Sequence, residues 1–134
     1  MIKIERLDHL VITVADIPRA IAFYVEVLGM QAVMFGNSST PRHALAFGQQ
    51  KINLHQAGKE FEPKAAAPTP GSADLCFLTQ TPLPDVIDHI QRKGISIIEG
   101  PVQRTGALGP ILSVYLRDPD QNLIEIANQL NVNP

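Results

Sequence analysis

The sequence contains one cysteine, no tryptophan and no long hydrophobic run. Because Cys76 is the only cysteine, no intramolecular disulfide can form, and we expect a reducing compartment such as the cytoplasm. No apolar segment approaches the ~20 residues that a membrane-spanning helix needs, and the first six residues carry charges where a signal peptide is apolar. These absences predict a cytoplasmic protein with no membrane partner.

Charge of either sign is also scarce. The 11 Lys and Arg residues nearly balance the 13 Asp and Glu residues, for a formal net charge of −2, so nucleic acid is not an expected partner. An apolar fraction of 45% is typical of a globular protein. No nucleophile motif, phosphate-binding loop or dinucleotide fingerprint is present. The length predicts one compact domain, residues 1–134.

The first half of the chain predicts a strand, a helix and further strands. Residues 7–14 form an apolar strand. The helix that follows begins after Asp16, whose side chain is expected to cap it, and ends at Gly29. Between these two residues the apolar positions follow the i, i+3, i+4, i+7 spacing of an amphipathic helix. Residues 44–47 and 51–56 are the next strand candidates.

The second half repeats this order. His9 lies as far before Gly29 as Asp74 lies before Gly94, so the two positions match when the helix ends are aligned. The repeat halves are about 1–57 and 72–130, and they predict an α+β fold of paired βαβββ units. The predicted elements of the second half are a strand at 73–78, a helix from Pro82 or Pro84 to Lys93, and strands at 112–117 and 122–126.

The last strand follows a turn, residues 118–122, whose Asp, Pro and Asn residues favour chain reversal. Period-2 alternation places Glu125 on the opposite face of the strand from Ile124 and Ile126. A charged carboxylate on that face needs a partner. His9, the only histidine in the first strand, is the proposed partner. Imidazole and carboxylate donors suit a divalent ion such as Zn, Ni, Co, Mn or Fe. The candidate ligands are His9, Asp74, Glu125 and either Asn53 or His55.

Simpler roles exist for each of these residues. His9 fits a hydrogen-bonded core histidine, Glu125 a surface acid on an edge strand, and Asp74 the cap of a turn. His55 fits a position at the rim of the fold.

Candidate substrate contacts also have simpler roles. Ser113 and Tyr115 lie on a predicted strand with one polar face, where a tyrosine is ordinary. Arg104 begins the segment 104–110, which is either a flap that meets an anionic substrate or a simple loop. Cys76 shares the face of Asp74, although a lone cysteine usually serves packing.

Three segments together resemble a known family. The segments are 7–11, 20–30 and 118–125, and they resemble the vicinal oxygen chelate superfamily, also called the glyoxalase, bleomycin-resistance and extradiol-dioxygenase group. Residues 51–55 and 70–77 further resemble glyoxalase-like virulence proteins of bacteria and the animal glyoxalase domain-containing protein 5.

The resemblance implies that the βαβββ units form a cupped mixed sheet. It also implies a homodimer, and a divalent ion that chelates two neighbouring oxygens of a small-molecule substrate. By position, His9 and Glu125 match the family's first-strand and last-strand ligands, while Asp74 stands where glyoxalase I has histidine. Asn53 aligns with a ligand glutamate of glyoxalase I, and His55 is the better ligand by its chemistry.

The function implied is that of a metal-dependent, glyoxalase-like lyase or isomerase acting on a small oxygen-rich substrate. Glu125 would carry the proton, with Asn53, Ser113, Tyr115 and Arg104 as substrate contacts. One alternative is an Fe(II) extradiol-type dioxygenase, for which His9, His55 and Glu125 would supply two histidines and one carboxylate. Another is a metal-free protein that binds a small molecule, as bleomycin-resistance proteins do.

Overall fold

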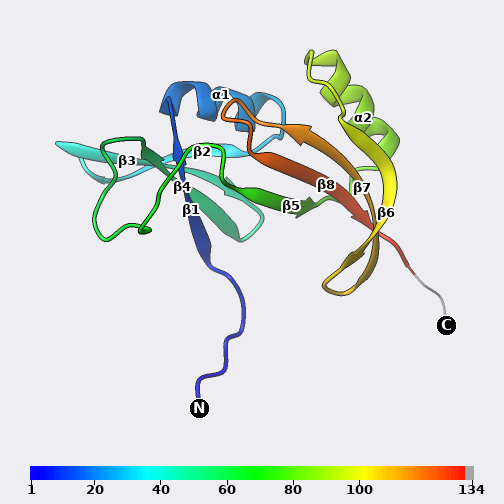
Figure 1. Cartoon of the computed structure of the whole chain (residues 1–134), viewed down its shortest axis with the longest axis horizontal. Coiled ribbons are helices and arrows are strands. Elements are labelled where there is room, and N and C mark those ends of the chain that lie inside the picture. The colour runs from blue at the N-terminus through cyan, green and yellow to red at the C-terminus, as the bar shows by residue number, and fades with distance from the viewer. Residues whose placement is uncertain (132–134) are drawn as a thin grey trace. The chain divides into compact units, whose positions relative to one another are not determined.

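The computed structural model describes residues 1–131, so the last three residues of the predicted domain lie outside the described residues. The chain divides after Pro70 into two compact units. Each unit has the order strand, helix and three strands (Figure 1), which confirms the predicted α+β fold of paired βαβββ units. Neither described helix is long and apolar enough to cross a bilayer.

The first unit is one four-stranded sheet with one helix. Its strand order is β1-β4-β3-β2, with β1 parallel to β4 and the other neighbours antiparallel. The first and last strands of the unit, β1 and β4, therefore lie side by side. The elements are β1 (His9–Val14), α1 (Ile17–Glu26), β2 (Gln31–Asn37), β3 (Thr40–Phe47) and β4 (Gln50–Gln56).

Alternation along β4 divides its side chains between two faces. Ile52 and Leu54 are 0% and 1% exposed and belong to the core that includes Tyr24 of α1, which is also 0% exposed. Burying side chains of this size contributes roughly 1.5–3 kcal/mol each. Because successive residues point to opposite faces, Lys51, Asn53 and His55 lie on the other face of the same strand.

The expected cap of the first helix is wrong. Asp16 flanks α1 in an extended conformation, with φ −151° and ψ 111°, and its side chain makes no capping hydrogen bond. Gln56, at the end of β4, takes that role: its Oε1 accepts the Ile17 N–H at 3.2 Å, and its Nε2 donates to the Ala15 carbonyl at 2.6 Å.

The second unit has the same construction, with strand order β5-β8-β7-β6. Asn128, near the end of β8, caps the second helix as Gln56 caps the first. Its Oδ1 accepts the Leu83 N–H at 2.8 Å, and its Nδ2 donates to the carbonyls of Thr79 and Thr81. The elements are β5 (Asp74–Leu78), α2 (Leu83–Arg92), β6 (Glu99–Gly106), β7 (Gly109–Arg117) and β8 (Leu123–Gln129).

The segment 104–110 is not a loop. It forms the tight hairpin between β6 and β7, in which Arg104 pairs with Ile111 and Thr105 with Pro110, leaving only residues 107 and 108 in the turn. The composition of the segment did not reveal these strands, because it does not show which residues pair across the hairpin.

Strand register makes the two units comparable residue by residue. His9 pairs with Lys51 between β1 and β4, and Asp74 pairs with Leu123 between β5 and β8. The predicted match of His9 with Asp74 is therefore confirmed, because each opens the first strand of its unit beside the same point of the last strand. Two residues further along, Asn53 corresponds to Glu125.

Candidate functional site

The turn before β8 fixes the position of Glu125. Asp118 is 2% exposed, and its Oδ1 accepts the backbone N–H groups of Asp120 and Asn122, each at 2.9 Å. Asn122 donates from Nδ2 to the Asp118 Oδ2 at 2.7 Å, and its Oδ1 accepts the Ala73 N–H at 2.8 Å. The turn is thereby tied to the residue before β5, which sets the register that places Glu125 beside Cys76.

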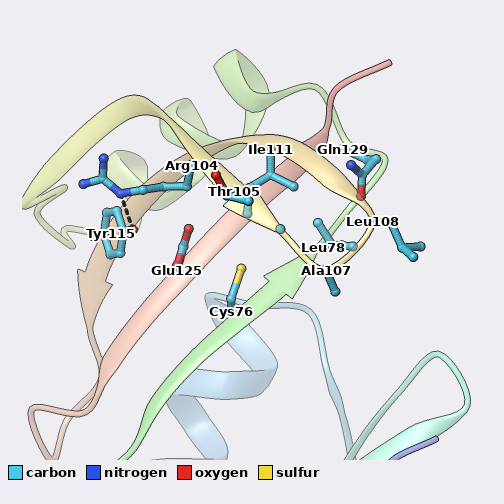
Figure 2. Close-up of a pocket in the computed structure, with 11 residues that line it drawn as sticks. Cys76, Leu78, Arg104, Thr105, Ala107, Leu108, Ile111, Tyr115, Glu125 and Gln129 are labelled. Carbon is cyan, nitrogen blue, oxygen red and sulfur yellow. Dashed lines mark hydrogen bonds between the residues drawn. The ribbon is translucent and has the colours of Figure 1, made fainter. Parts of the chain in front are cut away.

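Glu125 lines a pocket of about 540 Å³ within the second unit (Figure 2). This volume lies within the ~300–1,000 Å³ that is usual for small-molecule sites. One side of the pocket is apolar, and the other carries Arg104, Tyr115 and Glu125, three residues that also line a neighbouring hollow with Asp74. The apolar side is formed by Leu78, Ala107, Leu108 and Ile111.

Two buried oxygens in equivalent positions have no hydrogen-bond partner among residues 1–131. They are Oε2 of Glu125 and Oδ1 of Asn53. Leaving a buried acceptor unpaired costs about 1–3 kcal/mol, more for a charged group, so such atoms are uncommon in native proteins. A bound cation or a ligand donor would satisfy each of them, and amide and carboxylate oxygens are both hard donors that suit a divalent ion.

Ser113 is the third residue with such an atom. Its side chain is 0% exposed and its Oγ has no partner within the described part of the chain. It lies on β7 two residues before Tyr115, so the two share one face of the sheet.

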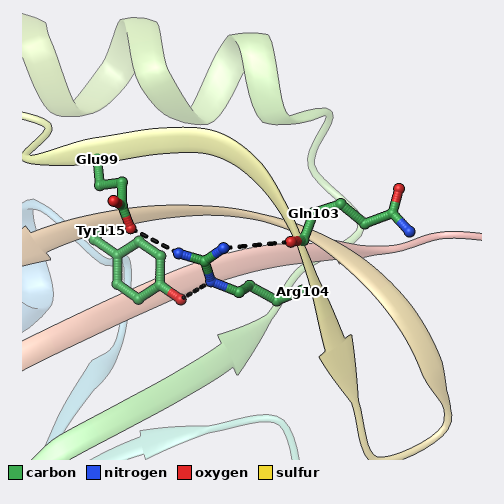
Figure 3. Close-up of polar contacts among 4 residues, drawn as sticks. All are labelled: Glu99, Gln103, Arg104 and Tyr115. Atoms are coloured by element: carbon green, nitrogen blue, oxygen red, sulfur yellow. Dashed lines mark hydrogen bonds and ion pairs between the residues drawn. The ribbon is translucent and has the colours of Figure 1, made fainter.

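Arg104 donates to three neighbours on the same sheet, of which Gln103 accepts through its backbone carbonyl at 3.5 Å (Figure 3). Its Nη2 donates to Glu99 Oε2 at 2.7 Å and its Nε donates to the Tyr115 hydroxyl at 3.0 Å. The Tyr115 contact is the main reason that the pKa of Arg104 lies above its ordinary value. Since the Tyr115 oxygen accepts from Arg104, its own O–H is directed elsewhere.

Cys76 is not a nucleophile at neutral pH. Its partial desolvation, together with the charge and hydrogen bonding of Glu125 and the charge of Asp74, raises the pKa of the Cys76 thiol to about 11. The thiolate is the reactive form, so the lone cysteine stays protonated under physiological conditions.

The two candidate histidines of the first unit have different surroundings. His9 Nδ1 lies 2.8 Å from Asp8 Oδ2. A histidine that donates Nδ1–H to a carboxylate presents its Nε2 lone pair, as metal-binding histidines commonly do. His55 is 3% exposed, and its Nε2 lies 3.3 Å from Arg42 Nη2. Burial, and then the charge of Arg42, lower the pKa of His55.

Register also separates these histidines. His9 pairs with Lys51 and His55 pairs with Thr13, so they lie four residues apart along neighbouring parallel strands. At a rise of about 3.3 Å per residue, this offset is about 13 Å. Asn53 is offset from His9 by two residues, as Glu125 is from Asp74. The register therefore favours Asn53 over His55 as the donor next to His9.

The proposed pairing of His9 with Glu125 stays a prediction, since the two residues belong to different units. Among residues 1–131, no group of three or more His, Cys, Asp or Glu side chains gathers closely enough to form a ligand cluster. Sequence reasoning missed Asp8 and Arg42. Asp8 stands directly before His9, and that adjacency was a usable signal, whereas Arg42 reaches His55 from another strand.

Residues 6–126 match a family model described as the Glyoxalase/Bleomycin resistance protein/Dioxygenase superfamily. Virulence protein STM3117 of Salmonella typhimurium is 64% identical over 124 residues, covering 92% of this chain and 84% of that protein. Glyoxalase domain-containing protein RDO1 of Mycosarcoma maydis is 57% identical over 127 residues, covering 95% of this chain and 70% of that protein.

Solved structures agree with these matches. The crystal structure of STM3117 has a TM-score of 0.92 and 61% identity, covering 96% of this chain and 100% of that chain. A lactoylglutathione lyase from Agrobacterium tumefaciens has a TM-score of 0.68 over 92% of both chains, and at 21% identity this likeness shows the fold alone.

Proposed function

Because the chain belongs to the Glyoxalase/Bleomycin resistance protein/Dioxygenase superfamily, we propose that it is a metal-dependent lyase or isomerase acting on a small oxygen-rich substrate. The observation that carries the proposal is the unpaired, buried Oε2 of Glu125 in a residue that lines a pocket of about 540 Å³. A buried carboxylate oxygen without a donor is stabilised by a cation or a substrate proton.

The proposed ligands of the ion are His9, Asp74 and Glu125, with Asn53 favoured over His55 as the fourth. The Asp8 contact supports His9, because it leaves Nε2 as the free donor atom. The unpaired Oδ1 supports Asn53. When bound, a divalent ion supplies Lewis acidity that polarises a substrate oxygen.

The chain's own residues would bind the substrate and move its proton. Glu125, with Oε2 on the ion, would accept a proton from the substrate at its other carboxylate oxygen and return it to a neighbouring atom, as a general base and then a general acid. Tyr115 and Arg104, both lining the pocket, bind a substrate oxygen, and Ser113 and Asn53 are further proposed contacts. The apolar side of the pocket holds the rest of the molecule and excludes water from the proton transfer.

The metal-free alternative also has support. A pocket with an apolar wall and a carboxylate suits a hydrophobic cation, and Glu125 lines the same pocket as Leu78, Ala107, Leu108 and Ile111 (Figure 2). The dioxygenase alternative is less well supported, because a 13 Å offset, at about 3.3 Å per residue, is too large for His9 and His55 of one unit to share an ion. We also propose a homodimer, which light scattering after size exclusion would test.

Metal analysis separates the two supported functions. Protein purified without added ions and then titrated with Ni, Co, Zn, Mn or Fe(II) is expected to bind one ion per chain. His9→Ala and Glu125→Gln are expected to lose it, while Asp88→Asn, which removes an exposed acid paired with Arg92, keeps it. Wild-type protein that binds no ion supports the metal-free function instead.

Turnover then tests the reaction class. The ion-loaded protein is assayed with the hemithioacetal of methylglyoxal and glutathione. Conversion by the wild-type protein that is absent from Glu125→Gln, which is also expected to lose the ion, supports the glyoxalase-like reaction. No conversion with any of the ions excludes glyoxalase I activity.

A further inference from the structure

Two cations lie on the face of the first sheet that carries Asn53. Lys51 and Asn53 occupy alternate positions of β4, and Arg42 of β3 reaches the same face, where its Nη2 contacts His55. Both cations are only partly exposed. Neither forms an ion pair with any carboxylate of residues 1–131.

Aromatic rings hold both cations in place. The Arg42 guanidinium carbon lies 4.5 Å from the ring centroid of Phe61 and 5.3 Å from that of Phe35. The Lys51 Nζ lies 4.0 Å from the centroid of Phe35. Such contacts are favourable, but they do not neutralise the charge or satisfy the N–H donors. The ring contacts therefore position both groups without using their hydrogen-bond donors.

The donors of Arg42 are largely unused. A guanidinium has five N–H groups, and within the described residues the one hydrogen bond found for its side chain is the one to His55. Arg104 in the second unit is a useful contrast, since it donates to Glu99 and Tyr115 and has its charge balanced. Partly buried cations without a counter-charge are stabilised by an anion.

Two acids that interact electrostatically with residues of this face are engaged elsewhere. Asp8 accepts from His9, and Glu60 accepts the backbone N–H of Gly58 at 3.0 Å. The His9 contact is the main reason that the pKa of Asp8 is lowered, with a small contribution from the charge of Lys51. Backbone hydrogen bonds are the main reason that the pKa of Glu60 is lowered, with a small contribution from His55. The two acids do not occupy the donors of Arg42.

We propose that Arg42 and Lys51 bind an oxyanion group, a carboxylate or a phosphate, of the substrate. The inference rests on the proposed function in one respect, that the anion is part of the molecule that the enzyme converts. Asn53 lies two residues from Lys51, about 7 Å along the strand, so a substrate anchored by its anion reaches the unpaired Oδ1 with a neighbouring oxygen-bearing carbon. The substrate class is therefore a small acid or phosphate ester that carries further oxygens near the anion.

The test uses the full chain, freed of metal with EDTA, at low ionic strength. Inorganic phosphate and acetate are titrated separately into ¹⁵N-labelled protein, and amide shifts of β3 and β4 are followed. Saturable binding of at least one anion is expected. Arg42→Met and Lys51→Met are each expected to weaken it about ten-fold, as for the loss of a charge-assisted hydrogen bond. The matched control Arg92→Met removes an exposed arginine of α2 and leaves the affinity unchanged.

Each outcome decides the matter. The anion that binds more tightly, phosphate or acetate, identifies which oxyanion group the site prefers. Absence of saturable shifts with both anions overturns the proposal, as does an equal loss in Arg92→Met, or unchanged affinity in Arg42→Met and Lys51→Met. If Arg42→Met fails to fold, Lys51→Met decides alone, because Lys51 makes a single ring contact. Because this titration uses metal-free protein, it is independent of metal binding. Anion binding by a protein that takes up no divalent metal ion leaves the anion site at Arg42 and Lys51 standing and removes the proposed function, and with it the statement that the anion belongs to a converted substrate.

Discussion

Asn122→Ala tests whether the turn before β8 holds the site together. Asn122 is 1% exposed and makes two side-chain hydrogen bonds, one to the buried Asp118 carboxylate and one from the Ala73 N–H. The substitution leaves one buried acceptor and one donor without these partners. At about 1–3 kcal/mol for each, with the larger value for the charged group, the expected loss is about 3–5 kcal/mol of unfolding free energy. This is a large part of the 5–15 kcal/mol typical of a domain.

Asn53→Ala is the matched control. Its side chain is 6% exposed, comparable to Asn122, but its Oδ1 has no partner among residues 1–131. Removing an amide whose buried oxygen is unpaired is expected to change the unfolding free energy of metal-free protein by less than about 1 kcal/mol, or to raise it. Urea denaturation followed by circular dichroism measures both variants. Equal losses in the two would refute the reasoning, because burial alone would then set the cost.

Three further outcomes are expected. The rate of Cys76 alkylation by iodoacetamide should rise with pH, with a midpoint near the Cys76 pKa of about 11. Glu125→Gln should lower this midpoint, because it removes a negative charge. A wild-type midpoint near 9 contradicts the prediction. Burial lowers the pKa of His55 on folding, so below about pH 6.5 the unfolded chain binds more protons than the folded chain. The unfolding free energy should therefore decrease as the pH is lowered through this range, and it should decrease less in His55→Gln. Gly71→Ala should cost about 1–3 kcal/mol more than Gly48→Ala in urea titrations, because both have positive φ but only at Gly71 does a Cβ meet a backbone oxygen, at 2.6 Å; equal losses contradict it.

The repeat could be predicted because its signals are local. Helix ends at Gly29 and Gly94, and the polar turn before the last strand, are written in short segments whose backbone preferences act over a few residues. Aligning those ends was enough to match His9 with Asp74. The cap of α1 could not be assigned in this way, because Gln56 reaches it from 39 residues away.

The choice between Asn53 and His55 could not be made from the sequence alone. Residues two apart on a strand share a face, so alternation treats the two alike. Only the pairing of β1 with β4 and of β5 with β8 shows that Asn53 occupies the position of Glu125, and pairing joins segments far apart in the chain. The proposed anion-binding face was missed for the same reason, since Arg42 and Lys51 meet the ring of Phe35 only after folding.

The most direct test of the account is an anomalous-difference map from crystals grown with Co²⁺. The account predicts one peak per chain at about 2.0–2.2 Å from Oε2 of Glu125, the distance usual for carboxylate ligands of such ions. A fully loaded crystal with no peak near that oxygen, or with the ion bound only at surface acids, would contradict the assignment of Glu125 as a metal ligand.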